Sequence, residues 1–332
     1  MAMKQRFTLS IILPLALLFL QHCSDAPVGS KSRPFTMYFV PSVDAQKLST
    51  ASESITAFVA KYVSQKLYNK DSGFYVKGAV PASYIAVVEA FGTKKADFAT
   101  FNTFSYVLAK DIKKYSVEAV LLVLRNNHER TYKGQIITRV DSGINKLEDL
   151  NGKKFAFTDA ASTSGFILPA KLLQDSHIKL ADQIFAQKHD NVVTMVYQKQ
   201  VDAGATYYSL PEEVEENGKK ISKITDARAR VLTQFPDVEK KVKIIGFTPD
   251  IPNEPWVIRG NLFEDAAKNT EIKNLIVEAV LAFADTEAGK LALHDLATGT
   301  GLEKVTDDTY ADVRKIFTSA NLNFEELLSK TK

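Results

Sequence analysis

The chain has 332 residues, a length that suits two domains of ordinary size, and its 45% of hydrophobic residues can form a sizeable core. The formal net charge is only +3, and no basic stripe is interleaved with aromatic residues, so a nucleic-acid partner is not expected. Residues 212–220 carry charges of both signs and are typical of a solvated surface.

The first 22 residues have the pattern of a signal peptide. Lys4 and Arg6 give a basic start, and the apolar run at 9–20 is too short to span a bilayer comfortably and is interrupted by Pro14. No second apolar stretch is long enough to cross a membrane. We therefore expect residues 1–22 to direct export and to be removed from the mature protein.

Cys23 is the only cysteine, and it stands close behind this apolar run. A lone thiol cannot form an intramolecular disulfide. Its surroundings are similar to a bacterial lipobox, in which the cysteine is lipidated and becomes the new N-terminus, although His22 occupies a position that is usually small. A plain secretory signal cut nearby is the alternative. We expect residues 23–34 to form a flexible tether between a lipid anchor and the folded domain.

Strand-like and helix-like runs alternate through the first half of the mature chain, which favours an α/β sheet. Thr50 and Glu53 predict a capping box at the start of the first long helix. The run at 119–124 is continuous in apolar residues, as buried parallel strands are. The predicted strands are 35–41, 74–76, 96–101 and 119–124, with a second helix after Ser83.

The second half of the chain repeats this alternation. Residues 132–140 and 241–247 are predicted to be extended segments that cross between two lobes, and residues 147–153 are predicted to be a short helix and its stop. The residues after Asn261 are predicted to be helical throughout. The sequence therefore predicts an α/β protein of two lobes joined by two crossing strands.

Three hydroxyl residues and a glycine separate a strand-like run at 154–158 from a helix-like run; they are Ser162, Thr163, Ser164 and Gly165. Free backbone N–H groups and the positive end of a helix dipole meet at such a place, so an oxyanion can bind there without a lysine or arginine. The hydroxyls can donate to its oxygens, and the glycine lets the backbone come close. The alternative is an ordinary helix N-cap, which needs only one hydroxyl.

Several short motifs also occur together in one order. They are residues 83–90, 97–99, 104–106, 141–144, 162–165, 201–204 and 251–255. This set resembles the phosphate, phosphite and phosphonate substrate-binding proteins of ABC transporters, the PhnD-like family. The resemblance runs from about Phe35 into the C-terminal region. It implies a type II periplasmic-binding fold with two crossing strands as a hinge, a small oxyanion ligand in the cleft and an ABC permease as partner.

The resemblance also implies the organisation and location of the protein. Lobe 1 would be discontinuous, formed by residues 35–131 and 248–332, and lobe 2 would be residues 132–247 with the hinge strands. Such a protein would be a monomer in the bacterial cell envelope, lipid-anchored at Cys23 and facing the periplasm or the cell exterior. No cofactor, metal ligand or catalytic residue is expected.

The ligand residues of the family map unevenly onto this sequence. The Ser-Thr-Ser-Gly stretch matches Ser162, Thr163 and Ser164, and a downstream histidine matches His189. This histidine could donate a hydrogen bond to an oxyanion, which would favour its charged form. The alternative for His189 is a surface position in a polar stretch. Tyr84 matches a tyrosine that leans over the ligand from the first lobe, and its alternative is a core aromatic.

Phe101 stands where the family often has an aromatic residue with a hydroxyl, so we expect packing without that hydrogen bond. Thr103 or Asn102 is expected to supply a polar contact instead.

In aminoalkylphosphonate binders, two carboxylates hold the ammonium group; Ser209 stands at one of these positions and Glu254 at the other.

The loss of one carboxylate bears on the choice of ligand. A carboxylate beside an oxyanion can only accept, so Glu254 would select a ligand that carries a donor, such as a protonated oxyanion. The alternative for Glu254 is a loop carboxylate that faces water. We therefore expect phosphate, phosphite or methylphosphonate rather than an aminoalkylphosphonate.

Two other functions are weighed against transport. One is a lipid-anchored sensor or surface protein on the same fold. The other is a hydrolase in which Ser162 or Ser164 acts with His189 and an aspartate. The sequence has no Gly-x-Ser-x-Gly elbow, His-Glu-x-x-His motif or P-loop, so the expected protein is not an enzyme.

Overall fold

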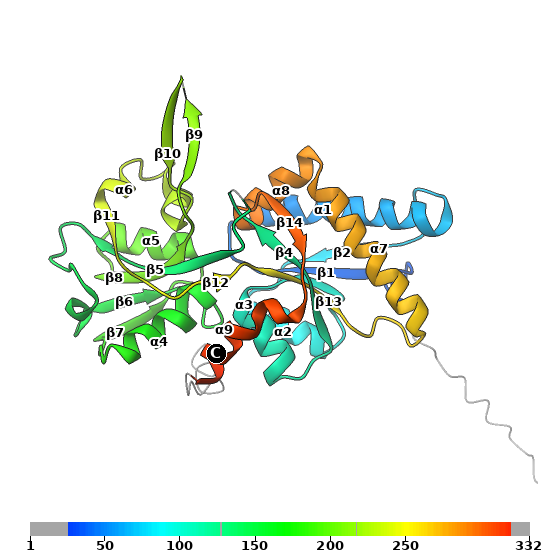
Figure 1. Ribbon diagram of the computed structural model, residues 1–332, viewed down its shortest axis with the longest axis horizontal. Helices are drawn as coiled ribbons and strands as arrows, with labels where there is room; N and C mark the ends of the chain where they lie inside the picture. The colour runs from blue at the N-terminus through cyan, green and yellow to red at the C-terminus, as the bar shows by residue number, and fades with distance from the viewer. Residues whose placement is uncertain (1–25, 127, 217, 320–332) are drawn as a thin grey trace, which may run out of the picture.

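The computed structural model describes residues 26–126, 128–216 and 218–319, which form two α/β lobes (Figure 1). The predicted signal peptide and the lipidation site at Cys23 lie outside the described residues. Within these described ranges, no helix is both long and apolar enough to cross a membrane.

The sheet of the first lobe mixes parallel and antiparallel strands. In sheet order the strands are β14 (Gly301–Lys304), β4 (Val117–Leu124), β13 (Pro255–Arg259), β3 (Phe98–Thr100), β1 (Phe35–Phe39) and β2 (Val76–Ala79). β1 pairs in parallel with β2 and β3, whereas β13 runs antiparallel to β3 and β4, and β14 runs antiparallel to β4.

The prediction that residues 119–124 form a parallel strand is therefore wrong in direction. Leu121 and Val123 pack into one hydrophobic cluster, whereas Leu122 and Leu124 pack into another on the opposite face. The continuous apolar run thus reflects burial on both faces, which an antiparallel strand also reaches when helices cover both sides.

The prediction of helix throughout the residues after Asn261 is also wrong, because β14 adds a strand at the edge of β4. This strand has four residues, and its burial is only intermediate to exposed. So short an edge strand, with a glutamate and a lysine in it, has almost no apolar pattern to predict it.

Helices cover both faces of this sheet. The first face is covered by α1 (Ala45–Tyr68), α7 (Ala266–Ala284) and α8 (Glu287–Ala297), and the second by α2 (Tyr84–Gly92), α3 (Thr103–Val107), η1 (Leu108–Ile112), η5 (Asp307–Tyr310) and α9 (Ala311–Ser319).

The predicted capping box of α1 is wrong. Asp44 caps this helix earlier by accepting from Gln46 N at 2.9 Å, and Glu53 accepts from the Ser49 hydroxyl.

The sheet of the second lobe has the order β11 (Val242–Phe247), β5 (Thr131–Arg139), β8 (Ala203–Tyr208), β6 (Lys154–Phe157) and β7 (Asp182–Phe185), with β12 (Ile251–Pro252) also paired to β5. Its helices are η2 (Leu147–Leu150), η3 (Thr163–Ile167), α4 (Leu168–Asp175), α5 (His189–Tyr197), η4 (Ala227–Val231) and α6 (Val238–Lys241). The chain passes between the sheets twice, from β4 to β5 and from β11 through β12 to β13 (Figure 1).

A two-stranded hairpin, β9 (Glu212–Glu216) with β10 (Lys219–Lys223), projects from the second lobe (Figure 1). Its register sets Glu216 opposite Lys219 and Glu215 opposite Lys220, so charges of opposite sign face each other across the strands. Most of its side chains are exposed, which confirms the predicted solvated surface.

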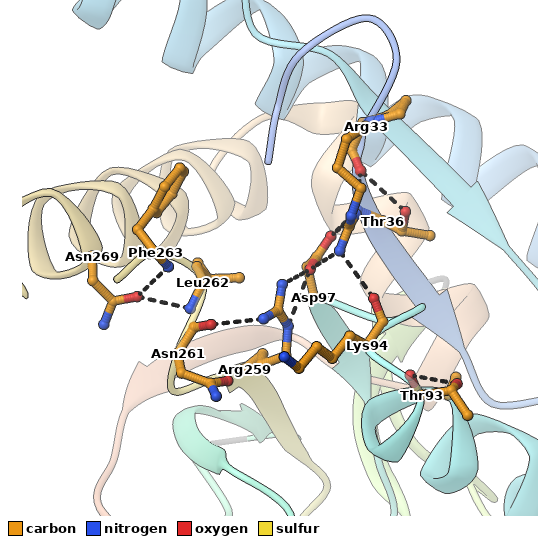
Figure 2. A network of polar contacts seen from close by, with 12 residues as sticks. Arg33, Thr36, Thr93, Lys94, Asp97, Arg259, Asn261, Leu262, Phe263 and Asn269 are labelled. Carbon is orange, nitrogen blue, oxygen red and sulfur yellow. Dashed lines mark hydrogen bonds and ion pairs between the residues drawn. The ribbon is translucent and has the colours of Figure 1, made fainter. Parts of the chain in front are cut away.

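Residues 29–33, which belong to the predicted tether and precede β1, are held against the first lobe, so this part of the tether is not flexible. Figure 2 shows Asp97 held between Arg33 and Arg259, with Arg33 Nη1 2.8 Å from Asp97 Oδ2 and Arg259 Nη2 2.5 Å from Oδ1. The Asp97 side chain is fully buried, so this pair of cations compensates a charge that would otherwise be costly. Upstream, Gly29 O accepts from Tyr75 N at 2.8 Å.

Candidate functional site

A cavity lies between the two lobes. The first lobe lines it with Val40, Ser42, Val43, Tyr84, Thr100, Phe101, Asn102, Arg125, Glu254, Trp256, Leu296, Ala297 and Thr298, and the second with Tyr132, Ser162, Ser164, His189, Tyr207 and Arg230. Its volume is about 60 Å³. At about 10–15 Å³ for one water, the space holds roughly four to six water-sized groups. That is the size of a tetrahedral oxyanion.

The predicted hydroxyl stretch forms the start of η3 and leads into α4. Ser162 Oγ caps this turn by accepting from Gly165 N at 3.0 Å, so the helix-cap alternative is correct for this one residue. The hydroxyl proton of Ser162 is still available to donate, and both Ser162 and Ser164 line the cavity. A Cβ on Gly165 would lie 2.1 Å from Thr158 Oγ1, so only glycine allows the turn to pack this closely.

Thr163 lies at the contact between the lobes, outside the cavity lining. Its hydroxyl accepts from Phe104 N at 2.8 Å and donates to Asn102 Oδ1 at 3.2 Å. Asn102 Nδ2 in turn donates to Ala161 O at 2.9 Å. These hydrogen bonds join η3 of the second lobe to the start of α3 in the first. Thr163 therefore contacts the other lobe, whereas Ser162 and Ser164 line the cavity.

Thr103 also lies outside the lining. Its hydroxyl donates to Pro252 O at 2.7 Å, so it fastens β12 to the first lobe. Asn102, the alternative to Thr103, does line the cavity. The structure thus brings together Tyr84, Phe101, Ser162, Ser164, His189 and Glu254 around one space, but not Thr103 and Thr163.

His189 is the first residue of α5 and is only 6% exposed, which overturns the surface alternative. Its Nδ1 lies 3.3 Å from Thr158 Oγ1, and its ring meets that of Tyr207 edge-on with the centroids 5.0 Å apart. Burial, reinforced by the nearby Arg230 guanidinium, lowers the pKa of His189 to about 3. In this structure the imidazole is therefore neutral near pH 7, and the charged form expected beside a bound oxyanion stays a prediction.

Arg125 and Glu254 form an ion pair on the first-lobe side, with Arg125 Nη2 2.6 Å from Glu254 Oε2. Arg125 also donates from Nη1 to Asn253 Oδ1 at 2.6 Å and from Nε to Ala297 O at 2.9 Å. The charge of Glu254 is therefore compensated before any ligand is considered. Because Arg125 occupies Oε2, Glu254 is not simply a loop carboxylate that faces water.

Arg230 and Tyr207 are the functional candidates that the sequence did not reveal. Arg230, in η4, lines the cavity and donates from Nε to the Tyr207 hydroxyl at 2.8 Å. Arg228 lies in the same turn but pairs with Asp226, with Nη2 2.7 Å from Oδ2. No local pattern distinguishes these two arginines, so only the fold decides which of them faces the cavity.

Two tyrosine hydroxyls complete the set of donors. Burial raises the pKa of Tyr84 well above its usual value, as it does for Tyr132. Both phenols therefore keep their protons at neutral pH and can donate. The cavity combines hydroxyl, phenol and guanidinium donors with only one carboxylate, which is already paired. Such a lining suits an oxyanion.

The geometry does not form a nucleophile and base. Among the described residues, the hydrogen bond of His189 goes to Thr158, not to Ser162 or Ser164. Asp190, next in sequence, has a buried Oδ1 without a hydrogen-bond partner, so it does not orient the imidazole. A serine hydrolase requires both of these contacts.

Two lobes joined by two crossings, with a cavity lined from both lobes, define the type II periplasmic-binding fold. The sequence profile of a family described as "ABC transporter, phosphonate, periplasmic substrate-binding protein" matches residues 37–310. The chain therefore belongs to this family, whose members are transport proteins and not enzymes. This confirms the resemblance and fold class inferred from the motifs.

Individual relatives are more distant. The phosphate-import protein PhnD of Mycolicibacterium smegmatis is 25% identical over 205 residues, which are 57% of this chain and 61% of that protein. The chain spans about three fifths of the length of the curated relatives it matches.

Solved structures agree on the fold. A phosphonate-transporter binding protein of Pseudomonas aeruginosa superimposes with a TM-score of 0.68 at 19% identity, over 92% of this chain and 93% of the other. PhnD1 of Prochlorococcus marinus, in complex with methylphosphonate, gives 0.66 at 18% identity, over 86% and 98%. At such identities the likeness establishes the fold alone.

The low pKa of His189 predicts a pH dependence of stability. Below about pH 6.5, the unfolded chain takes up a proton on His189 that the folded protein excludes until about pH 3. The free energy of unfolding of the wild type should therefore fall more steeply than that of His189→Gln as the pH drops from about 6.5 towards 4. Urea denaturation followed by circular dichroism at several pH values measures both.

Above about pH 6.5 the two proteins should show parallel pH profiles, because His189 is neutral in both states. His294→Gln is the control, since the His294 side chain is 70% exposed. Equal slopes for wild type and His189→Gln between pH 4 and pH 6.5 would contradict a buried, neutral imidazole.

Proposed function

We propose that the protein captures a small phosphorus oxyanion, namely phosphate, phosphite or a small phosphonate, in the interlobe cavity and delivers it to an ABC permease. The observation that carries the proposal is the cavity lining, where Ser162, Ser164, Tyr84 and Tyr207 surround the ligand space with hydroxyl groups and Arg230 adds a cation. Charge-assisted hydrogen bonds of this kind are the strong ones in anion recognition.

Closure of the lobes would complete the site. Residues of both lobes line the cavity, so neither lobe can enclose a ligand alone. The hydrogen bonds of Thr163 and Asn102 would stabilise the closed form. Thr163 would therefore raise the affinity for the ligand by stabilising the closed form. Thr103 would contribute to it by holding β12 in place. The residue divisions 35–131 with 248–332, and 132–247, are the proposed lobes.

We further propose that Cys23 carries a lipid that holds the protein in the bacterial cell envelope, facing the periplasm or the exterior, as a monomer beside its permease. The basic start, the apolar run and the single cysteine behind it support this anchor. A sensor on the same fold would share the cavity and the anchor, and would differ in having no transport partner.

Ser164 tests the binding site. Its hydroxyl lines the cavity, and a hydrogen bond to a charged group contributes about 1.5–3 kcal/mol. Ser164→Ala should therefore weaken binding of phosphate, phosphite or methylphosphonate by roughly 10- to 100-fold. Isothermal titration calorimetry on protein stripped of bound ligand measures this change.

The matched control for this substitution is Ser222→Ala, which removes an exposed hydroxyl on β10 and should leave binding unchanged. If Ser164→Ala binds every active oxyanion as tightly as the wild type, the η3 turn is not the anion site. If the wild type binds none of the three oxyanions, the proposed function itself is wrong.

Cys23 tests the anchor. Cys23→Ser should abolish incorporation of labelled fatty acid and release the protein from membranes, because the thiol is the acceptor of the lipid. Membrane retention without label in either protein would show that another element holds it there.

A further inference from the structure

The cavity contains two guanidinium groups, and only one of them has its charge compensated. Arg125 is 3% exposed, and its hydrogen bonds go to the Glu254 carboxylate, the Asn253 amide, the Ala297 carbonyl and the Thr298 hydroxyl. Arg230 donates one hydrogen bond, from Nε, to the neutral hydroxyl of Tyr207. Within the described part of the chain, no carboxylate lies within ion-pair distance of Arg230.

The wider surroundings of Arg230 do not replace such a partner. Its neighbours across the cavity lining are the neutral His189 and the Tyr207 ring, whose centroid is 5.8 Å from the guanidinium carbon. Asp190 on α5 and Asp295 on α8 act on Arg230 only at longer range. A partly buried guanidinium that lines the cavity, with a phenol as its hydrogen-bond partner, is stabilised by an anion placed beside it.

The electrostatic balance of the lining has a consequence for the ligand. Arg125 and Glu254 neutralise each other, which leaves one net positive charge on Arg230. A ligand that carries its own ammonium group would bring a second cation into the same space. The Glu254 carboxylate already accepts from Arg125 at 2.6 Å, so an ammonium would have to share its negative charge with Arg125.

Space leads to the same conclusion. The cavity of about 60 Å³ takes roughly four to six water-sized groups, which is close to the five heavy atoms of phosphate or methylphosphonate. An aminoethylphosphonate adds two further heavy atoms to methylphosphonate, and these would need either room or a rearrangement of the lining.

We propose that Arg230 is the counter-charge of the bound oxyanion and makes the cavity select compact anions without a cationic substituent over aminoalkylphosphonates. This inference rests on the proposed function and deepens it, because it names the residue that sets the substrate class. Arg230 acts as a specificity-determining residue, and the Tyr207 hydroxyl orients its guanidinium through the 2.8 Å hydrogen bond.

The experiment compares two ligands that differ only in the ammonium-bearing extension, methylphosphonate and 2-aminoethylphosphonate, together with inorganic phosphate. Calorimetric titrations use the wild type, Arg230→Gln and Arg230→Lys. Lys219→Gln, which removes the same charge from the exposed β10 strand, is the control. Circular dichroism melting confirms that each variant is folded.

The wild type should bind methylphosphonate at least 10-fold more tightly than 2-aminoethylphosphonate. Arg230→Gln should weaken phosphate and methylphosphonate by roughly 10- to 100-fold, since a charged hydrogen bond is lost. It should weaken the binding of 2-aminoethylphosphonate less, so the difference in affinity between the two phosphonates should become smaller. Arg230→Lys keeps the charge and should retain most of the preference, and Lys219→Gln should behave as wild type.

Undiminished binding of phosphate and methylphosphonate by Arg230→Gln would overturn the role of Arg230 and leave the proposed function standing. Equal or tighter binding of 2-aminoethylphosphonate by the wild type would also overturn it, and this result needs no variant to fold. Absence of wild-type binding to all three ligands would defeat the proposed function, and the inference with it.

Discussion

The contact between Thr163 and the Asn102–Phe104 segment is the interaction on which the rest of the site depends. These hydrogen bonds join the η3 turn of one lobe to the start of α3 in the other. With the lobes held together, Ser164 and His189 of the second lobe and Tyr84 and Glu254 of the first line a single cavity. If that contact opened, each lobe would expose half of an anion site to water, where every hydrogen bond contributes less.

Burial determines which charged groups are stable in the cavity. The same desolvation that lowers the pKa of His189 to about 3 makes an uncompensated cation unfavourable. Arg125 resolves this by pairing with Glu254, as Arg33 and Arg259 do around Asp97, outside the cavity lining (Figure 2). Arg230 pairs with a phenol instead, and in the proposed function the oxyanion would be its counter-ion.

The fold class and some of the residues that line the cavity could be predicted from local patterns. Ser162 and Ser164 were recognisable because a strand, a hydroxyl run and a helix follow one another in sequence. The direction of β4 was not, because an apolar run reports burial on both faces and carries no information on the orientation of β13 and β14.

The hydrogen-bond and ion-pair partners of the polar side chains could not be predicted from the sequence either. Thr163 bonds to residues about sixty positions earlier in the chain, and Arg125 bonds to Glu254, 129 positions later. Arg228 and Arg230 are two residues apart in one turn, yet one pairs with Asp226 and the other faces the cavity. Such choices depend on tertiary geometry, which composition and periodicity do not contain.

The central claim is that an oxyanion and closure of the two lobes stabilise each other. Small-angle X-ray scattering on protein stripped of ligand, with and without saturating phosphate, tests it most directly. We expect the radius of gyration to fall when phosphate binds, because the anion would compensate Arg230 and favour the Thr163–Asn102 contact. An unchanged radius of gyration at a phosphate concentration that calorimetry shows to be saturating would contradict it.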